Sequence, residues 1–561
     1  MEERIRKAVG EFLTQKGAGS VSFVVERPTE AAHGDYTTNA ALAAAKMLGK
    51  NPRELADELA RHLIDALGES AASHVAVAGP GFVNITLVRE AVALATAEAD
   101  AQGSEWGKAK TAEGGSPDAS RSDAFRGKRV IIEYSNPNAF KEMHIGHLVG
   151  TVVGESISRL IENTGATVRR DTFGGDIGPN VAKALWGLRF NGVAEPTTAK
   201  EIGEAYVVGS NNYELGAKAE IDALNQEIYA GNNHEVMGLW RKGRDISVEE
   251  FRRIWKLLGT HFDFEFFDSD TTDIGVRVVT DGLNRGVFEK SDGAIIYNGE
   301  KKGVHTMVFI TSHDTPTYEA KDIGLAFLKE ERWPSDISII ITGNEQAGRF
   351  KTVLAALTEV APLLAAKTRH ITTGFLKLMS GKMSSRTGTI ITASDFIRDV
   401  ISRASERNAD PLIAEQVAIG AIKYMVLRQA PGSDIIFDPE KSLSLEGDSG
   451  PYLQYALVRA KKILSYDDNG EGGTEEPAAP YAIERVIMHY PEVAARAARE
   501  LAPNILTTYL TELAAAWNSF YAVEQVLGSP EEAYKQRVAR AFANTMTNGL
   551  ALLGISAPER M

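Results

Sequence analysis

The sequence predicts an α/β protein with three folded parts: a small N-terminal α+β domain, a central domain with a parallel sheet, and a C-terminal all-α helical bundle. Strand and helix patterns alternate from Lys128 to about Asp395, as a parallel sheet requires. After Pro411 the apolar residues recur almost only at helical spacing. The chain has 561 residues, which is too long for one core and suggests roughly three or four domains.

The composition is that of an ordinary globular protein. Hydrophobic residues make up 43% and charged residues 24% of the chain, which is typical of a soluble protein. No window approaches the apolar length of a membrane span, and the amphipathic start MEERIRKAVGEFL does not resemble a signal peptide. The absence of cysteine excludes disulfides, thiolate zinc sites and cysteine nucleophiles. We therefore expect a cytoplasmic protein.

We expect the first domain to span residues 1–105. Helical patterns cover Tyr36–Leu48 and Pro52–Leu67, and Asn51 and Pro52 form an N-cap and first-turn pair. The segment VAVAGPGFVNITLV reads as two strands around a Gly-Pro-Gly turn. These patterns by themselves indicate only a compact α+β unit.

The remaining boundaries follow from composition and pattern. Residues 106–127 contain almost nothing to bury and read as a flexible linker. The central domain is predicted for 128–410, with helices rich in Trp, Tyr and charge inserted at about 184–271. The helical bundle then takes 411–561, and composition alone allows it to be a dimerisation bundle.

The stretch VIIEYSNPNAFKEMHIGHL, from Val130 to Leu148, organises the central domain. A short buried strand ends at the Ser-Asn-Pro-Asn segment, because Pro137 lacks an N–H group. A helical pattern begins after Met143, so His144 and the residues that follow it lie at a helix start. Unpaired N–H groups and the helix dipole at such a start favour binding of a phosphate.

Two histidines and a glycine at this helix start are candidate phosphate-binding residues. His144 and His147 are three residues apart, share a helix face and can both reach one phosphate group. Gly146 has no side chain to keep a nucleotide from the backbone. On spacing alone, a surface pair or a partial metal site is an equally good interpretation of the histidines.

A second motif lies far downstream, in the loop KMSSR at Lys382–Arg386. Alone it reads as a polar turn. HIGH after a strand, followed by KMSSR, resembles the signature pair of class I aminoacyl-tRNA synthetases. The resemblance implies a Rossmann-like catalytic domain, ATP with Mg²⁺ as the substrate complex, no permanently bound cofactor and no metal held by the protein. It implies ATP binding by His144, Gly146, His147, Lys382, Met383, Ser384 and Ser385.

The reaction of that class needs no nucleophilic side chain. The amino acid carboxylate attacks the α-phosphate of ATP and pyrophosphate leaves, so catalysis is positioning and neutralisation of charge. We expect His144 and His147 to stabilise the phosphate and Lys382 to hold pyrophosphate. Ser385 stands where many class I enzymes have a second lysine, and we hypothesise that Lys141 supplies that charge instead.

The segment PTYEAKD points to the amino acid. Tyr318 and Asp322 are four residues apart and share one helix face, and Pro316 and Thr317 mark its start. An arginine substrate presents a planar fork of donors that calls for carboxylates. An exposed helix pair is the bland alternative.

The sequence resembles arginyl-tRNA synthetases over nearly its whole length, through HGDYTTNAALAAAK, AGPGFVNITL, PTYEAKD and the closing LGISAPERM. The resemblance implies that L-arginine is bound by Glu133, Asn138, Tyr318, Asp322 and Gln346. Two departures stand out: Arg349 replaces a histidine that the family often has, and SHDTPTY replaces a commoner Ser-Asp-Gly version.

The resemblance also implies a tRNA partner that is needed for adenylate formation, and a protein that is often monomeric. The N-terminal domain would hold the tRNA elbow on the D-loop side, and the bundle would read the anticodon. Candidate contacts are Tyr36, Phe82, Asn84, Tyr455, Arg459, Tyr509 and Trp517. Tyr509 and Trp517 also fit a core stripe. The net charge of −14 requires a local basic face for tRNA.

Three rival interpretations remain. A synthetase for another amino acid is disfavoured by PTYEAKD, and a HIGH-type nucleotidyltransferase has no use for the helical domain. A tRNA-binding paralogue without catalysis is disfavoured by the intact His144, His147 and Lys382.

Overall fold

The computed structural model describes residues 1–28, 30–109, 124–379, 391–466 and 473–561. Its α/β, α+β and helical parts confirm the predicted fold class. The chain divides into two compact units. The first contains 1–108, 455–496 and 508–549, and the second contains 109–454, 497–507 and 550–561.

The N-terminal part of the first unit is a four-stranded sheet packed against helices. The helices are α1 (Glu2–Gln15), α2 (Ala40–Leu48) and α3 (Pro52–Leu67), and the sheet order is β1-β2-β4-β3. Its strands are β1 (Val25–Glu26), β2 (Tyr36–Thr38), β3 (Ala72–Ala78) and β4 (Phe82–Leu87). The side chain of Asn51 accepts a hydrogen bond from the Arg53 N–H at 2.9 Å, which confirms the predicted N-cap.

The helix predicted over Tyr36–Leu48 is wrong in its first residues. Tyr36–Thr38 forms β2, which pairs with β4 in antiparallel register, and the helix begins only at Ala40. Partner strands far along the chain satisfy the β2 backbone, and helical periodicity in a single segment does not reveal them.

The helical part of the first unit buries an aromatic core. Its elements are α4 (Arg89–Gln102), α18 (Ala482–Ile487) and most of α17 (Gly450–Leu464), α20 (Pro503–Val523) and α21 (Glu532–Leu552). Trp517 is fully buried and stacks on Phe542 with ring centroids 4.6 Å apart. The Tyr509 hydroxyl donates to the Val486 carbonyl oxygen at 3.0 Å.

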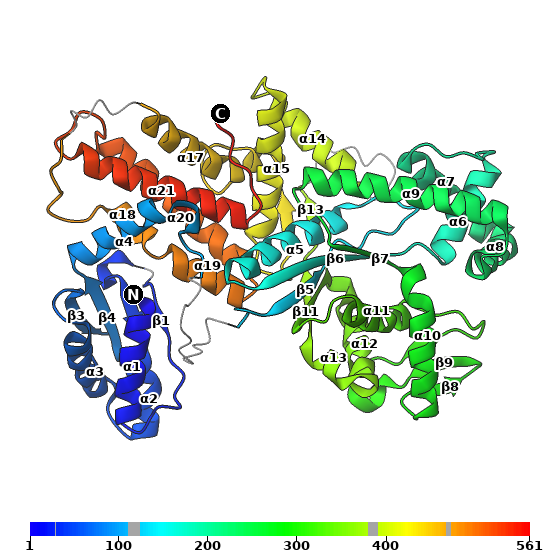
Figure 1. The fold of residues 1–561 in the computed structure, drawn as a ribbon, viewed down its shortest axis with the longest axis horizontal. Helices are drawn as coiled ribbons and strands as arrows, with labels where there is room; N and C mark the ends of the chain where they lie inside the picture. Colours follow the sequence, from blue (N-terminus) through cyan, green and yellow to red (C-terminus); the bar gives the residue numbers. More distant parts are fainter. Residues whose placement is uncertain (29, 110–123, 380–390, 467–472) are drawn as a thin grey trace. The chain divides into compact units, whose positions relative to one another are not determined.

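A parallel five-stranded sheet forms the centre of the second unit (Figure 1). Its strands are β5 (Arg129–Glu133), β6 (Thr167–Gly174), β7 (Phe264–Phe267), β11 (Ile337–Gly343) and β12 (Thr368–Thr373), in the order β12-β11-β5-β6-β7. The chain order therefore reverses between β5 and β11. In open α/β sheets, ligands bind beyond the carboxyl ends of the strands at such a switch point.

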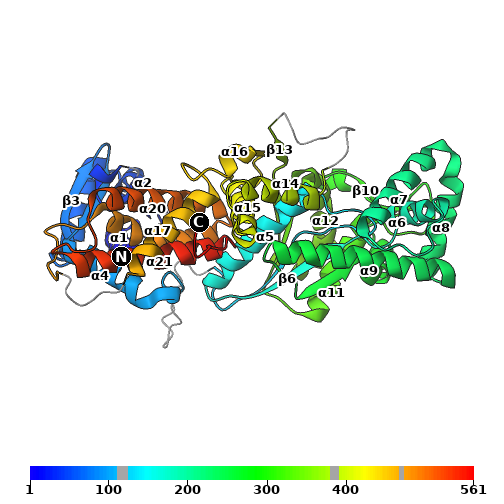
Figure 2. The same cartoon turned by 90° about the horizontal axis from the view of Figure 1, so that it is seen from above.

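Four helices that lie between β6 and β7 in the sequence pack together, on the right in both views (Figure 1 and Figure 2). They are α6 (Pro179–Phe190), α7 (Ala199–Asn212), α8 (Lys218–Ala230) and α9 (His234–Leu257), and they share one hydrophobic cluster. The sequence predicts that the inserted helices end near residue 271. The structure returns to the main sheet with β7, which pairs with β6.

Smaller elements complete the second unit. After α10 (Asp268–Asn284), an antiparallel sheet contains β8 (Glu289–Ser291), β9 (Ala294–Tyr297) and β10 (Met307–Ile310). The helices α11 (Tyr318–Arg332), α12 (Ala347–Val360) and α13 (Pro362–Lys367) follow, and then α14 (Ala393–Ser405) and α15 (Pro411–Leu427). A short parallel pair joins β13 (Leu376–Leu378) to β14 (Ile435–Phe437). None of the helices in the described ranges is long and apolar enough to cross a membrane.

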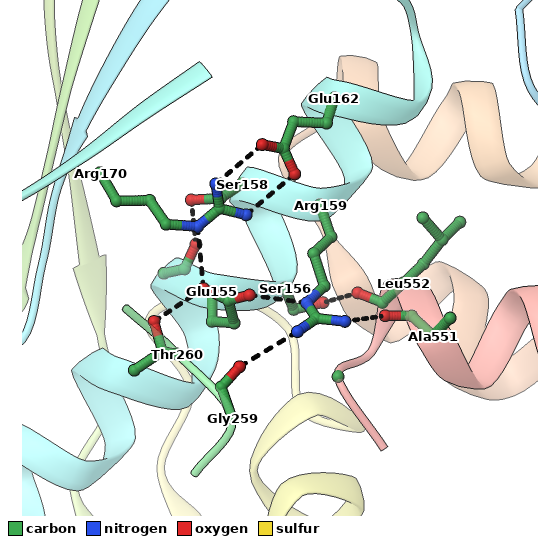
Figure 3. Close-up of polar contacts among 12 residues, drawn as sticks. Glu155, Ser156, Ser158, Arg159, Glu162, Arg170, Gly259, Thr260, Ala551 and Leu552 are labelled. Atoms are coloured by element: carbon green, nitrogen blue, oxygen red, sulfur yellow. Dashed lines mark hydrogen bonds and ion pairs between the residues drawn. The ribbon is translucent and has the colours of Figure 1, made fainter. Parts of the chain in front are cut away.

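The helix α5 (Ile145–Asn163) is fastened to the sheet by one buried carboxylate (Figure 3). Glu155 accepts hydrogen bonds from Arg159 at 2.6 Å, Arg170 at 3.0 Å, Thr260 at 2.7 Å and Tyr134 at 2.9 Å. Burial by itself raises the pKa of Glu155, but Arg170 and Arg159 lower that pKa below its ordinary value. The carboxylate therefore stays charged and joins α5 to β6.

The same helix holds the last residues of the chain. Arg159 donates to the carbonyl oxygens of Ala551 at 3.0 Å and Gly259 at 3.1 Å, and Ser156 donates to that of Leu552 at 3.1 Å (Figure 3). These bonds satisfy carbonyl groups at the end of α21, which have no partner within that helix.

We predict that Glu155→Ala lowers the free energy of unfolding by about 3–5 kcal/mol, because the buried Arg170 guanidinium loses a buried partner. Urea unfolding followed by tryptophan fluorescence measures this change. The control is Glu204→Ala on α7, which removes an exposed i,i+4 ion pair with Lys200 and should cost below about 1 kcal/mol. Equal losses in the two variants would contradict the importance of Glu155.

Candidate active site

The segment between β5 and α5 has a strained backbone. Ser135, Asn136 and Phe140 have φ values of 75°, 49° and 64°, a region that residues other than glycine rarely adopt. Hydrogen bonds from other elements hold this conformation. Ser135 Oγ accepts from the Trp255 indole N–H at 2.9 Å, and the Phe140 N–H donates to Ser247 Oγ at 3.1 Å.

Two imidazoles close the first turn of α5. His144 is the N-cap residue, and its Nδ1 accepts from the Gly146 N–H at 3.1 Å. Nδ1 of His147 accepts from the His144 N–H at 3.3 Å. The two rings stack with centroids 3.7 Å apart. Because both Nδ1 atoms accept hydrogen bonds, each neutral ring carries its proton on Nε2.

The surroundings keep both histidines neutral. Burial lowers the pKa of His144, and Lys141 lowers it further, while Glu345 acts in the opposite direction. Burial also lowers the pKa of His147 well below its ordinary value, with smaller effects of His144 and Lys141. Lys141 thus acts on both histidines, and its Nζ lies 4.3 Å from the centroid of the Tyr206 ring.

Gly146 is required by its neighbour. A Cβ atom at this position would lie 2.9 Å from Cε1 and 3.0 Å from Nδ1 of the His144 ring. A side chain would therefore displace the stacked imidazole. This contact adds a local reason for glycine to the nucleotide access expected from the sequence.

Glu133 ends β5, and both of its carboxylate oxygens already have partners. Oε1 accepts from Asn136 Nδ2 at 2.9 Å, and Oε2 accepts from Lys329 Nζ at 2.6 Å. Lys329 also lies 2.7 Å from Asp171 Oδ2. Glu133 is 1% exposed. Each oxygen of Glu133 therefore has one partner inside the protein and a second lone pair that can still accept a hydrogen bond.

Tyr318 and Asp322 begin α11 as predicted, but they contact different elements. The Tyr318 hydroxyl accepts from Asn180 Nδ2 on α6 at 3.3 Å, and 47% of the tyrosine is exposed. Asp322 is largely buried and forms an ion pair with Arg349 on α12. Gln346 accepts from Nε of the same Arg349 at 2.8 Å.

Asn138 lies beside the glycine turn after β6. Its Oδ1 accepts from the Gly175 N–H at 3.2 Å, and a Cβ at Gly175 would lie only 2.3 Å from that oxygen. Glycine is thus the residue that fits there. In the described part of the chain no acceptor contacts Asn138 Nδ2, so this group can donate to a ligand.

The KMSSR loop lies outside the described residues. The predicted ATP contacts of Lys382, Met383, Ser384 and Ser385 lie in this loop. Asn138, Gln346 and the two histidines are all placed at the carboxyl ends of β5, β6 and β11 or at the helix that follows β5.

The candidate tRNA contacts divide into buried and accessible residues. Tyr36, Tyr509 and Trp517 are 1%, 4% and 0% exposed, so the expectation that they touch tRNA is corrected: they pack in the core. Tyr36 instead donates to Glu492 at 2.8 Å. The partly exposed candidates are Phe82 and Asn84 on β4, and Tyr455 and Arg459 on α17.

Comparisons with known proteins agree along the whole chain. A family model described as the catalytic domain of class I tRNA synthetases (R) matches residues 118–439. The arginyl tRNA synthetase N terminal domain matches 1–87, and the DALR anticodon binding domain matches 453–561. The arginine–tRNA ligase of Treponema denticola is 30% identical over 476 residues, covering 79% of this chain and 80% of the relative. This chain belongs to the arginyl-tRNA synthetase family.

Further relatives extend the match. The arginine–tRNA ligase of Limosilactobacillus reuteri is 28% identical over 590 residues and is covered completely, as is this chain. The solved arginyl-tRNA synthetase of Thermus thermophilus has the same fold, with a TM-score of 0.81, 24% identity and full coverage of both chains. As a member of this family, the chain is an arginine–tRNA ligase. Its synthetase and anticodon-binding domains imply tRNA, an amino acid and ATP as partners.

Asn136 and Lys329 are not among the site residues predicted from the sequence, and Arg349 appears there only as a departure from the family pattern. Asn136 bridges Glu133 and the Phe173 N–H, at 2.9 Å each. The Ser-Asn-Pro-Asn turn was a signal for Asn136, since asparagine tolerates positive φ. Lys329 lies on an ordinary amphipathic helix, and no pattern marks it as the partner of Glu133.

We predict that His147 remains neutral at pH 6, where a free histidine is mostly protonated, and that His144 titrates at a lower pH than free histidine, because burial lowers both pKa values. NMR of the protein labelled with ¹⁵N-histidine should show two rings with the proton on Nε2. The urea-unfolded protein supplies the reference titration. Protonation of both rings near the reference pKa would contradict the structure.

Proposed function

We propose that this arginine–tRNA ligase activates L-arginine with ATP beyond the carboxyl ends of β5 and β11, and then transfers arginine to the 3′ end of its tRNA. The observation that carries the proposal is the stacked pair of imidazoles, which directs two Nε2–H donors from one helix start. Donors arranged before the reaction stabilise developing charge at low cost.

In the first step, the arginine carboxylate attacks the α-phosphorus of ATP and pyrophosphate leaves. We propose that His144 and His147 donate to phosphate oxygens and that Gly146 allows the nucleotide to approach. A bound phosphate raises the pKa of a nearby imidazole, so proximity of ATP would strengthen these hydrogen bonds. Lys382 would hold the leaving pyrophosphate.

The amino acid would bind beside this helix start. We propose that Asn138 and Gln346 hold its α-amino and carboxylate groups, and that Tyr318 and Asp322 contact its guanidinium. Glu133, whose oxygens are bonded to Asn136 and Lys329, would act through its charge. A planar guanidinium next to a buried carboxylate forms charge-assisted hydrogen bonds.

Magnesium would enter with ATP as part of the substrate. In the described ranges no group of three or more acidic or histidine side chains is arranged to hold a metal ion. We further propose a cytoplasmic monomer with tRNA contacts at Phe82, Asn84, Tyr455 and Arg459. Most of the linker expected at 106–127 lies outside the described residues.

Charging tests the function directly. We expect unfractionated tRNA with ATP and each of twenty labelled amino acids to gain label from arginine alone. His147→Ala should reduce this rate about 10²–10³-fold, as loss of one transition-state donor does. The Asn side chain of His147→Asn can still accept from the His144 N–H and so keep the helix cap. An equal loss of charging rate in His147→Ala and His147→Asn would show that the loss comes from catalysis and not from capping.

Two results would contradict the proposal. Charging by another amino acid would overturn the arginine assignment. Tight tRNA binding without any charging would favour a tRNA-binding paralogue. His234→Ala, an exposed position at the start of α9, is the control and should charge like the wild type.

The role of Lys141 needs its own variant. We predict that Lys141→Ala slows arginyl-adenylate formation about tenfold or more, because a cation near the phosphates is lost. Pyrophosphate exchange in the presence of tRNA measures this step. Lys141→Arg should recover part of the rate, and unchanged exchange in Lys141→Ala would refute the hypothesis.

A further inference from the structure

Arg349 joins two residues of the proposed amino acid site. It lies in the first turn of α12, directly after the short 3-10 helix η6 (Asn344–Gln346) that follows β11. Its guanidinium forms an ion pair with Asp322 through Nη1 and donates from Nε to Gln346 Oε1 at 2.8 Å. The guanidinium carbon lies 4.7 Å from the centroid of the Phe350 ring.

We propose that Arg349 is a positioning residue for L-arginine, which aims the Asp322 carboxylate and the Gln346 amide at the substrate. This inference rests on the proposed function. It assigns a role to Arg349 and makes amino acid affinity depend on a side chain that need not touch the amino acid.

The hydrogen bond to Gln346 decides which way its amide points. Because Oε1 accepts from Arg349, the two N–H groups of the amide are directed elsewhere and can donate to the substrate carboxylate. Asp322 likewise contacts Arg349 through only one of its two carboxylate oxygens. Its Oδ2 is paired with Arg349, whereas no donor within the described ranges contacts Oδ1. A carboxylate accepts about four hydrogen bonds, so both guanidinium groups can share Asp322.

Arg349 also controls the charge of Asp322. Burial, together with Glu133 and Glu319, raises the pKa of Asp322 to about 7 even though Arg349 lowers it. Removal of a cation in direct contact raises the pKa of a carboxyl by about 1–3 units. Without Arg349, Asp322 would be largely protonated at pH 7 and would regain its charge only at higher pH.

The charges around Asp322 leave room for a second cation. The groups that act on Asp322 are Arg349 on α12, Glu133 on β5 and Glu319 on α11. Lys329 on α11 pairs with Glu133 and with Asp171 on β6, and His370 on β12 lies near Glu133 and Arg349. Burial lowers the pKa of His370 to about 4, so that ring is neutral. Carboxylates therefore outnumber cations in this group, and the guanidinium of a substrate can balance them beside Arg349.

The test uses the complete enzyme and the variant Arg349→Met. We expect calorimetric titration with L-arginine to show about fivefold weaker binding than the wild type at pH 7, because a rise of about one unit from a pKa of about 7 lowers the ionised fraction of Asp322 from about a half to about a tenth. The difference should shrink to below about twofold at pH 8.5. In aminoacylation the KM for arginine should rise while the KM for ATP stays unchanged.

Two further variants guard the conclusion. Arg349→Lys keeps the positive charge without the planar fork and should recover part of the arginine affinity at pH 7. Arg252→Met removes an exposed pair with Glu265 and should bind like the wild type. Thermal unfolding of each variant checks that the fold is retained.

Opposite results would overturn the inference. Tighter arginine binding by Arg349→Met at both pH values would show that Arg349 competes with the substrate for Asp322. Equal weakening at both pH values, without recovery in Arg349→Lys, would show a merely structural role. Failure of the wild type itself to bind or charge arginine would instead refute the proposed function.

Discussion

The buried carboxylate of Glu155 is the contact on which the position of α5 depends. A carboxylate inside a protein is costly unless it is paired and hydrogen-bonded. Glu155 meets that condition only when Arg170 of β6 and Thr260 (Figure 3) and also Tyr134 surround it together. The helix therefore has one position against the sheet, and its first turn, with both histidines, has one position beyond β5.

The strained segment before α5 depends on the same arrangement. Ser135 lies in the left-handed region of φ and is held by Trp255 of α9, and Asn136 is held between Glu133 and Phe173. Such a conformation persists when the surrounding structure supplies more contacts than the strain costs. The segment between β5 and α5 is therefore held in one conformation between the proposed phosphate-binding and amino-acid-binding residues.

The proposed phosphate-binding and amino-acid-binding subsites lie close enough to interact electrostatically. Glu345, one residue before Gln346, raises the pKa of His144 against the effect of burial. The reversal of strand order between β5 and β11 places the start of α5 and the segment after β11 at one crevice. In-line transfer between two substrates benefits from this proximity, because positioning replaces much of the entropy cost.

Local pattern was sufficient for the strand–turn–helix around His144, for the Asn51 cap and for the helix beginning at Tyr318, because each depends on neighbours within one or two turns. Only the tertiary structure decided that Lys329 forms an ion pair with Glu133, that Arg349 forms one with Asp322, and that Trp517 is buried in the core. These contacts join residues on separate elements. Their partners are chosen by packing and by the need to pair buried charge, which no periodicity along the chain records.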